Sequence, residues 1–61
     1  MTKHAAILAL ENIEAAAIQG YAGGTLTALT AGMLRLELVN SETEIDALER
    51  AEKFIDEVKA A

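Results

Sequence analysis

The chain has 61 residues, with five basic and ten acidic side chains and a formal net charge of −5. It holds no Cys, no Pro and no Trp, so disulfides and thiolate metal sites are excluded. The acidic balance and the scarcity of aromatic rings argue against direct nucleic-acid binding, because such proteins present basic faces and stacking rings.

Ala and Leu dominate the apolar 52% of the chain. Both are strong helix formers, and β-branched residues never alternate over the length of a strand. The composition therefore predicts an all-α fold with a single helical domain over residues 1–61. Large aliphatic side chains are few relative to the entropy of ordering the chain. Because neither a disulfide nor a metal completes the core, we expect assembly into a homo-oligomeric helical bundle.

The first two thirds of the chain admit two interpretations. The favoured one is a single helix over about 4–39, in which small residues recur every four positions and form a ridge for close packing. Apolar residues from Ala15 to Leu36, among them Ile18, Leu26, Leu29 and Met33, also step by three or four throughout. The small-residue ridge consists of Ala16, Gly20, Gly24, Ala28 and Gly32.

The alternative interpretation is a three-helix bundle with a turn at 20–24. A first helix would end near Gln19, with Gly20 as its left-handed C-cap, and a second would begin with Thr25 as its N-cap. Three glycines inside one long helix would cost about 1 kcal/mol each, so the single helix requires close packing in return.

The last third of the chain predicts a helix over about 42–60. Ser41 followed by Glu44 fits a capping box. Leu48, Ala51 and Ile55 step by three and four and form one apolar stripe. With the long helix, this element completes a helical hairpin; in either interpretation the neighbouring helices run antiparallel.

Two sets of candidate site residues follow. The expected oligomer interface combines the small-residue ridge with the C-terminal stripe, namely Ala16, Gly20, Gly24, Ala28, Gly32, Leu48 and Ile55. Hydroxyls and a guanidinium near the glycines form a candidate pocket for a small nucleotide-like ligand. The candidate ligand-binding residues are Tyr21, Thr25 and Arg35.

No catalytic residue, metal ligand or cofactor is predicted. His4 is the single His, and Glu11 and Glu14 lack the His three residues on that a di-iron bundle requires. No phosphate-binding loop motif is present. We therefore do not expect an enzyme.

The uncharged stretch over residues 15–34 has the length of a membrane span. It contains four Gly and three Thr, and no basic cluster flanks it, so a membrane-associated protein is only the third alternative. The N-terminus does not resemble a signal peptide. A cytoplasmic protein is expected.

The leading functional hypothesis is a small non-enzymatic binding protein that regulates, adapts or inhibits another macromolecule, and whose partners are itself and a host or regulatory protein. In size and helical architecture the predicted hairpin resembles small plasmid and phage regulators that dimerise into four-helix bundles; that resemblance carries over no residues. The runner-up is a protein of this phage or plasmid type that sequesters a nucleotide-like ligand between subunits.

Overall fold

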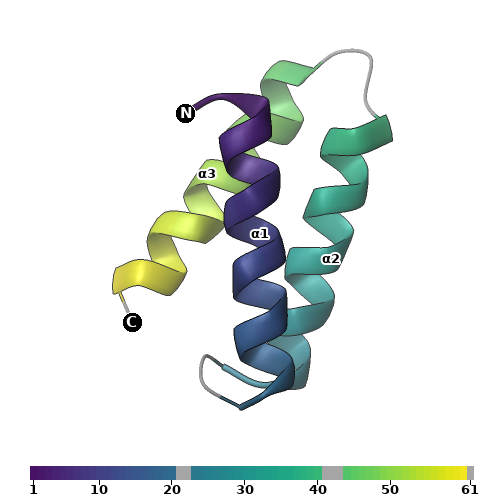
Figure 1. Ribbon diagram of the computed structural model, residues 1–61. Helices are drawn as coiled ribbons and strands as arrows, with labels where there is room; N and C mark the ends of the chain where they lie inside the picture. The colour runs from purple at the N-terminus through teal and green to yellow at the C-terminus, as the bar shows by residue number, and fades with distance from the viewer. Residues whose placement is uncertain (21–22, 41–43, 61) are drawn as a thin grey trace.

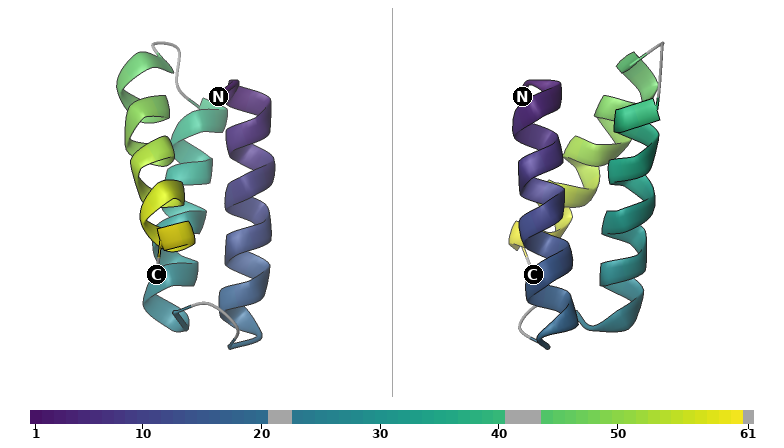
Figure 2. Two further views of the ribbon diagram at one scale, coloured as in Figure 1. Left: turned by 90° about the vertical axis from the view of Figure 1, so that its left-hand side faces the viewer. Right: turned by 45° about the vertical axis from the view of Figure 1, so that its right-hand side comes forward.

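The structure is a computed structural model that describes residues 1–20, 23–40 and 44–60. Within these residues the chain forms three α-helices and no strand: α1 (Lys3–Ile18), α2 (Thr25–Asn40) and α3 (Glu44–Ala60). Helices α1 and α2 lie side by side and antiparallel (Figure 1), and they share the most extensive contact in the fold. Helix α3 crosses this pair obliquely and packs against both (Figure 2). The predicted all-α class is confirmed.

The single helix over 4–39 is wrong, and the three-helix alternative with a turn at 20–24 is correct. Helix α1 ends at Ile18, and Gln19 forms its C-cap with a backbone N–H that bonds the carbonyl of Ala15 at 3.2 Å. Gly20, Gly23 and Gly24 then adopt φ values of +86°, +83° and +78°. Glycine adopts this left-handed region with little strain and costs about 1 kcal/mol inside a helix, so the clustered glycines favour the turn over the continuous helix.

The helix boundaries follow from local capping. The Thr2 hydroxyl accepts a hydrogen bond from the backbone N–H of Ala5 at 3.1 Å and caps α1. The Gly24 carbonyl accepts the first bond of α2 from Ala28 N–H at 3.0 Å, so Gly24, and not Thr25, is the N-cap. The predicted C-terminal helix is confirmed over 44–60; the capping box at Ser41 lies outside the described residues.

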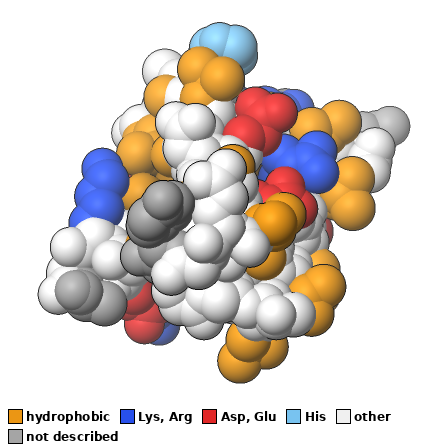
Figure 3. Space-filling model, turned by 60° about the horizontal axis from the view of Figure 1, so that its bottom comes forward, with side chains coloured by type: hydrophobic (Ala, Val, Ile, Leu, Met, Phe, Trp, Pro, Cys, Tyr) orange, Lys and Arg blue, Asp and Glu red, His pale blue; other side chains and the backbone are white. Residues whose placement is uncertain are grey.

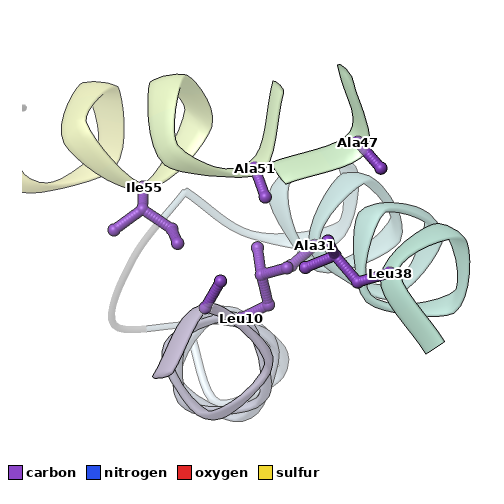
Figure 4. Packing of buried hydrophobic residues seen from close by; sticks show 7 residues of the cluster. Leu10, Ala31, Leu38, Ala47, Ala51 and Ile55 are labelled. Carbon is purple, nitrogen blue, oxygen red and sulfur yellow. The ribbon is translucent and has the colours of Figure 1, made fainter. Parts of the chain in front are cut away.

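The core between the helices is built mainly from small side chains. Only three large side chains are fully buried among the described residues, one from each helix: Leu10, Leu38 and Ile55. These three point into the space between the helices, with alanines around them (Figure 4). Small residues let the helix backbones approach closely, but each buries little apolar surface. The remaining buried residues are Ala6, Ala17, Ala28, Ala31, Ala47 and Ala51.

None of the helices in the described part of the chain has both the length and the apolar character needed to cross a membrane.

Candidate functional site

The most distinctive surface feature is a row of large apolar side chains on the solvent side of α2. Leu26, Leu29, Met33 and Leu36 are exposed by 76%, 61%, 65% and 52%, and we call these four residues the α2 stripe. Their spacing of three, four and three places them on one side of the helix. In Figure 3, where the end at which α1 and α2 meet is turned forward, hydrophobic side chains stand in separate groups along the right-hand and lower margins of the molecule.

Two further apolar side chains extend this exposed surface. Ile18, at the end of α1, is 71% exposed, and Val39, in the last turn of α2, is also more than half exposed. Single exposed apolar residues are ordinary on a protein surface, whereas a contiguous set marks an interaction site or a ligand groove. The α2 stripe with its two neighbours is such a set.

A groove of about 690 Å³ runs between the C-terminal part of α1 and α2. The buried residues Ala17 and Ala28 line it together with exposed members of the α2 stripe, Leu29 and Met33. The small side chains are the reason that the groove exists, because a larger residue at either alanine would fill it. Because alanines, glycines and large apolar side chains make up most of its lining, the groove is mostly apolar.

One ion pair lies at this groove. Arg35 Nε on α2 is 3.7 Å from Oε1 of Glu14 on α1, and both side chains are about 30% exposed. The Nε atom itself is buried and makes no hydrogen bond. Gly32 leaves room for the carboxylate, since a Cβ there would lie 2.9 Å from Oε2 of Glu14. The charge that Arg35 brings to the groove is thus opposed at close range by Glu14.

The second charged residue of α2 is also paired. Arg50 on α3 donates a hydrogen bond of 2.8 Å to Oε2 of Glu37. This hydrogen bond, and then the negative charge of Glu37, raise the pKa of Arg50. Arg35 and Glu37 are the only charged residues of α2, so its side chains leave no unpaired charge beside the α2 stripe.

The predicted ligand-binding residues are brought together only in part. Thr25 and Arg35 line the same groove, and Tyr21 lies outside the described residues. Thr25 and Arg35 are ten positions apart on the helix, which corresponds to about 15 Å along the axis. The two side chains therefore stand near opposite ends of the groove and do not converge on one small polar group.

The residues predicted for the oligomer interface fall into two groups. Ile55 is fully buried within the single chain, and Leu48 packs against the same core. The ridge is not continuous, because it is interrupted by the turn. Four of its members line the groove, and Ala16, in α1, is partly buried. The four groove-lining members are Gly20, Gly24, Ala28 and Gly32.

The sequence reasoning did not assign the α2 stripe to a site, although its members were part of a recognised apolar pattern. The signal was that α2 also carries apolar residues on its other side, where Ala28, Ala31 and Leu38 are buried. A helix that is apolar on two sides needs cover on both of them. With only two neighbouring helices among the described residues, one side of α2 stays open to solvent.

Among the described residues no group of three or more His, Cys, Asp or Glu side chains is placed to hold a metal ion, and His4 is exposed on α1. Comparison of the chain with protein-family models, with curated proteins and with solved structures found no match.

Proposed function

We propose that this chain is a small cytoplasmic, non-enzymatic protein that works by binding another macromolecular surface, as a regulator, adaptor or inhibitor, and that the α2 stripe is its binding surface. The observation that carries the proposal is the exposure of the four stripe residues, each more than half open to solvent. The absence of Cys accords with a reducing compartment.

A large amount of apolar surface is left exposed, relative to the few large side chains inside. The exposed fractions of the stripe, Ile18 and Val39 add up to nearly four whole side chains, whereas three large side chains are fully buried among the described residues. Covering this surface would contribute roughly 6–11 kcal/mol per chain, at about 1.5–3 kcal/mol per side chain. Association itself costs about 4–15 kcal/mol, so burial on two partners is of the magnitude that binding needs.

The groove chemistry also supports binding over catalysis. Its carboxylate and its guanidinium are engaged with each other, at Glu14 and Arg35, and the described residues that line it include no His. General acid–base catalysis needs a group that can exchange a proton near neutral pH within reach of a substrate. Neither a paired Arg nor an apolar wall supplies such a group.

Site-specific cross-linking tests the proposal in cells of the organism that encodes the chain. A photo-cross-linking amino acid in place of Leu29 is expected to form a covalent adduct with a protein partner, which includes a second copy of the chain. The matched control is Leu8, an exposed leucine on α1 that does not line the groove. Adducts at neither position, or equally at both, would remove the basis for the α2 stripe as a binding surface.

Sequestration of a small molecule is a second candidate, and the groove volume favours it. About 690 Å³ falls within the usual range for ligand pockets, and Thr25 and Arg35 place polar groups on its walls. A thermal-shift screen against nucleotides and cyclic nucleotides tests it. A stabilisation of several degrees that Arg35→Gln abolishes would support this candidate, and a screen without any stabilising nucleotide would eliminate it.

A further inference from the structure

We infer that a second copy of this chain covers the α2 stripe, with α2 of one copy packed antiparallel against α2 of the other. This inference rests on the proposed function, because it names the partner of the same surface. Three properties of the surface support it: its charge, its area and its spacing.

The lack of unpaired charge on the surface favours an apolar partner. Arg35 and Glu37 are engaged with Glu14 and Arg50 on the neighbouring helices, so α2 presents no unpaired charged side chain. A nucleic acid or a highly charged protein would lose hydration against such a surface without gaining a compensating pair. A second copy offers a surface that is equally neutral and apolar.

The area of the surface approaches what a stable dimer needs. A standard interface buries about 800 Å² per partner, of which somewhat more than half, about 450 Å², is apolar. Each fully covered aliphatic side chain removes on the order of 60–120 Å² from water. The nearly four side chains' worth left exposed by the stripe, Ile18 and Val39 therefore supply between half and all of that apolar area.

The spacing of the stripe suits a two-fold symmetric pair. Steps of three, four and three read the same in both directions, so an antiparallel copy places Leu26 opposite Leu36 of the second copy. The same register places Leu29 opposite Met33 of the second copy. Such a pairing is isologous and closes as a dimer.

The antiparallel direction follows from the ends of the helix. Both charged residues, Arg35 and Glu37, lie in the C-terminal half of α2. Parallel packing would set like helix-dipole ends beside each other, which is unfavourable. Antiparallel packing moves the charges to opposite ends of the interface.

Sedimentation of the purified full chain tests the dimer directly. At micromolar concentration we expect twice the 6.5 kDa mass of the chain, with no loss of dimer as salt is raised. Leu29→Glu should give a helical monomer, whereas the matched control Leu8→Glu should remain dimeric. A wild-type monomer throughout the micromolar range, or an equal loss of dimer in both variants, would overturn the inference.

Disulfide trapping tests the register and does not depend on the charge variants folding. The chain has no native Cys, so Leu26→Cys and Leu36→Cys can be mixed in equal amounts and oxidised. The antiparallel register brings these positions within disulfide range and predicts a mixed disulfide well above the statistical share. Predominance of like pairs would refute the antiparallel arrangement.

Sedimentation, together with the cross-linking at position 29 described above, separates this inference from the proposed function. A monomeric wild-type chain that still cross-links through position 29 to a different protein in cells refutes the second copy and leaves the binding surface intact. A monomer that forms no adduct at position 29 refutes both.

Discussion

Gly24, which precedes α2, and Gly32, which lies inside α2, are expected to respond to alanine in opposite directions. Gly24 has a φ of +78°, and a Cβ built there would meet nothing within 4 Å. The cost of Gly24→Ala is therefore backbone strain alone. Strain of about 1–2 kcal/mol for an L residue, less the gain from a stiffer unfolded chain, leaves a loss of about 1 kcal/mol. For a domain of this size that loss lowers the melting temperature by roughly 4–8 °C.

Gly32→Ala should have the opposite sign. Gly32 lies inside α2, where alanine gains about 0.8–1 kcal/mol in helix propensity. The added Cβ would lie 2.9 Å from Oε2 of Glu14, which is the far end of a flexible side chain and can move aside. The movement weakens a partly exposed ion pair at 3.7 Å with Arg35, and such a pair contributes little. We expect a rise of a few degrees.

The assay for both glycines is thermal unfolding followed by circular dichroism at equal protein concentration, because self-association would make the midpoint concentration-dependent. Gly24→Leu is the control for space: it should melt close to Gly24→Ala, since a Cβ at this position meets no atom within 4 Å. An increase in midpoint for Gly24→Ala would refute the left-handed turn and restore the continuous helix. A decrease for Gly32→Ala would show that Glu14 cannot yield.

Three further outcomes are expected from the same melts. Leu38→Ala removes one of the three large, fully buried side chains and should cost about 2–5 kcal/mol, enough to abolish a cooperative transition in so small a core. Thr2→Ala removes the cap of α1 and should cost about 0.5–1 kcal/mol, seen as a shift of a few degrees. Glu37→Gln should leave the midpoint unchanged, because its bond to Arg50 joins exposed side chains. The raised pKa of Arg50 adds stability that is fully present below the ordinary pKa of a guanidinium and is lost only as the pH rises through the raised pKa, so Arg50 should give no pH dependence near neutrality.

The fold was predictable as far as local signals decide it. Composition predicts the all-α class, and the stripe through Ile55 predicts the C-terminal helix. The error over 4–39 arose because small residues recur every four positions on both sides of a turn. Periodicity alone cannot detect that break, whereas the preference of Gly20 and Gly24 for positive φ can, and the structure follows that preference.

The site was less predictable, because α2 is apolar on two sides. Whether Ala31 or Leu29 faces the core depends on which side of α2 is covered by α1 and α3. Tertiary packing determines that side, and the local sequence of α2 does not. Close helix packing selects the side with small residues, where Ala28 and Ala31 are buried. Leu26, Leu29 and Leu36 are left outside, even though each would bury more surface than an alanine.

The residues of α2 that pack inside the fold and those of the α2 stripe are separate, and this separation has a consequence for variants. The small residues and positive-φ glycines set how closely α1 and α2 approach, and the α2 stripe is available for association. Gly24 lies in the turn and Met33 in the middle of α2, nine residues apart, which places them more than 10 Å from each other along the helix. Substitutions at such distant sites are additive when nothing couples them. Gly24→Ala and Met33→Glu should therefore add in the melting of a dilute monomer. If the stripe is covered by a second copy, the cost of Met33→Glu should grow as protein concentration rises while the cost of Gly24→Ala stays constant, because only Met33→Glu then also removes the stabilisation that dimerisation provides.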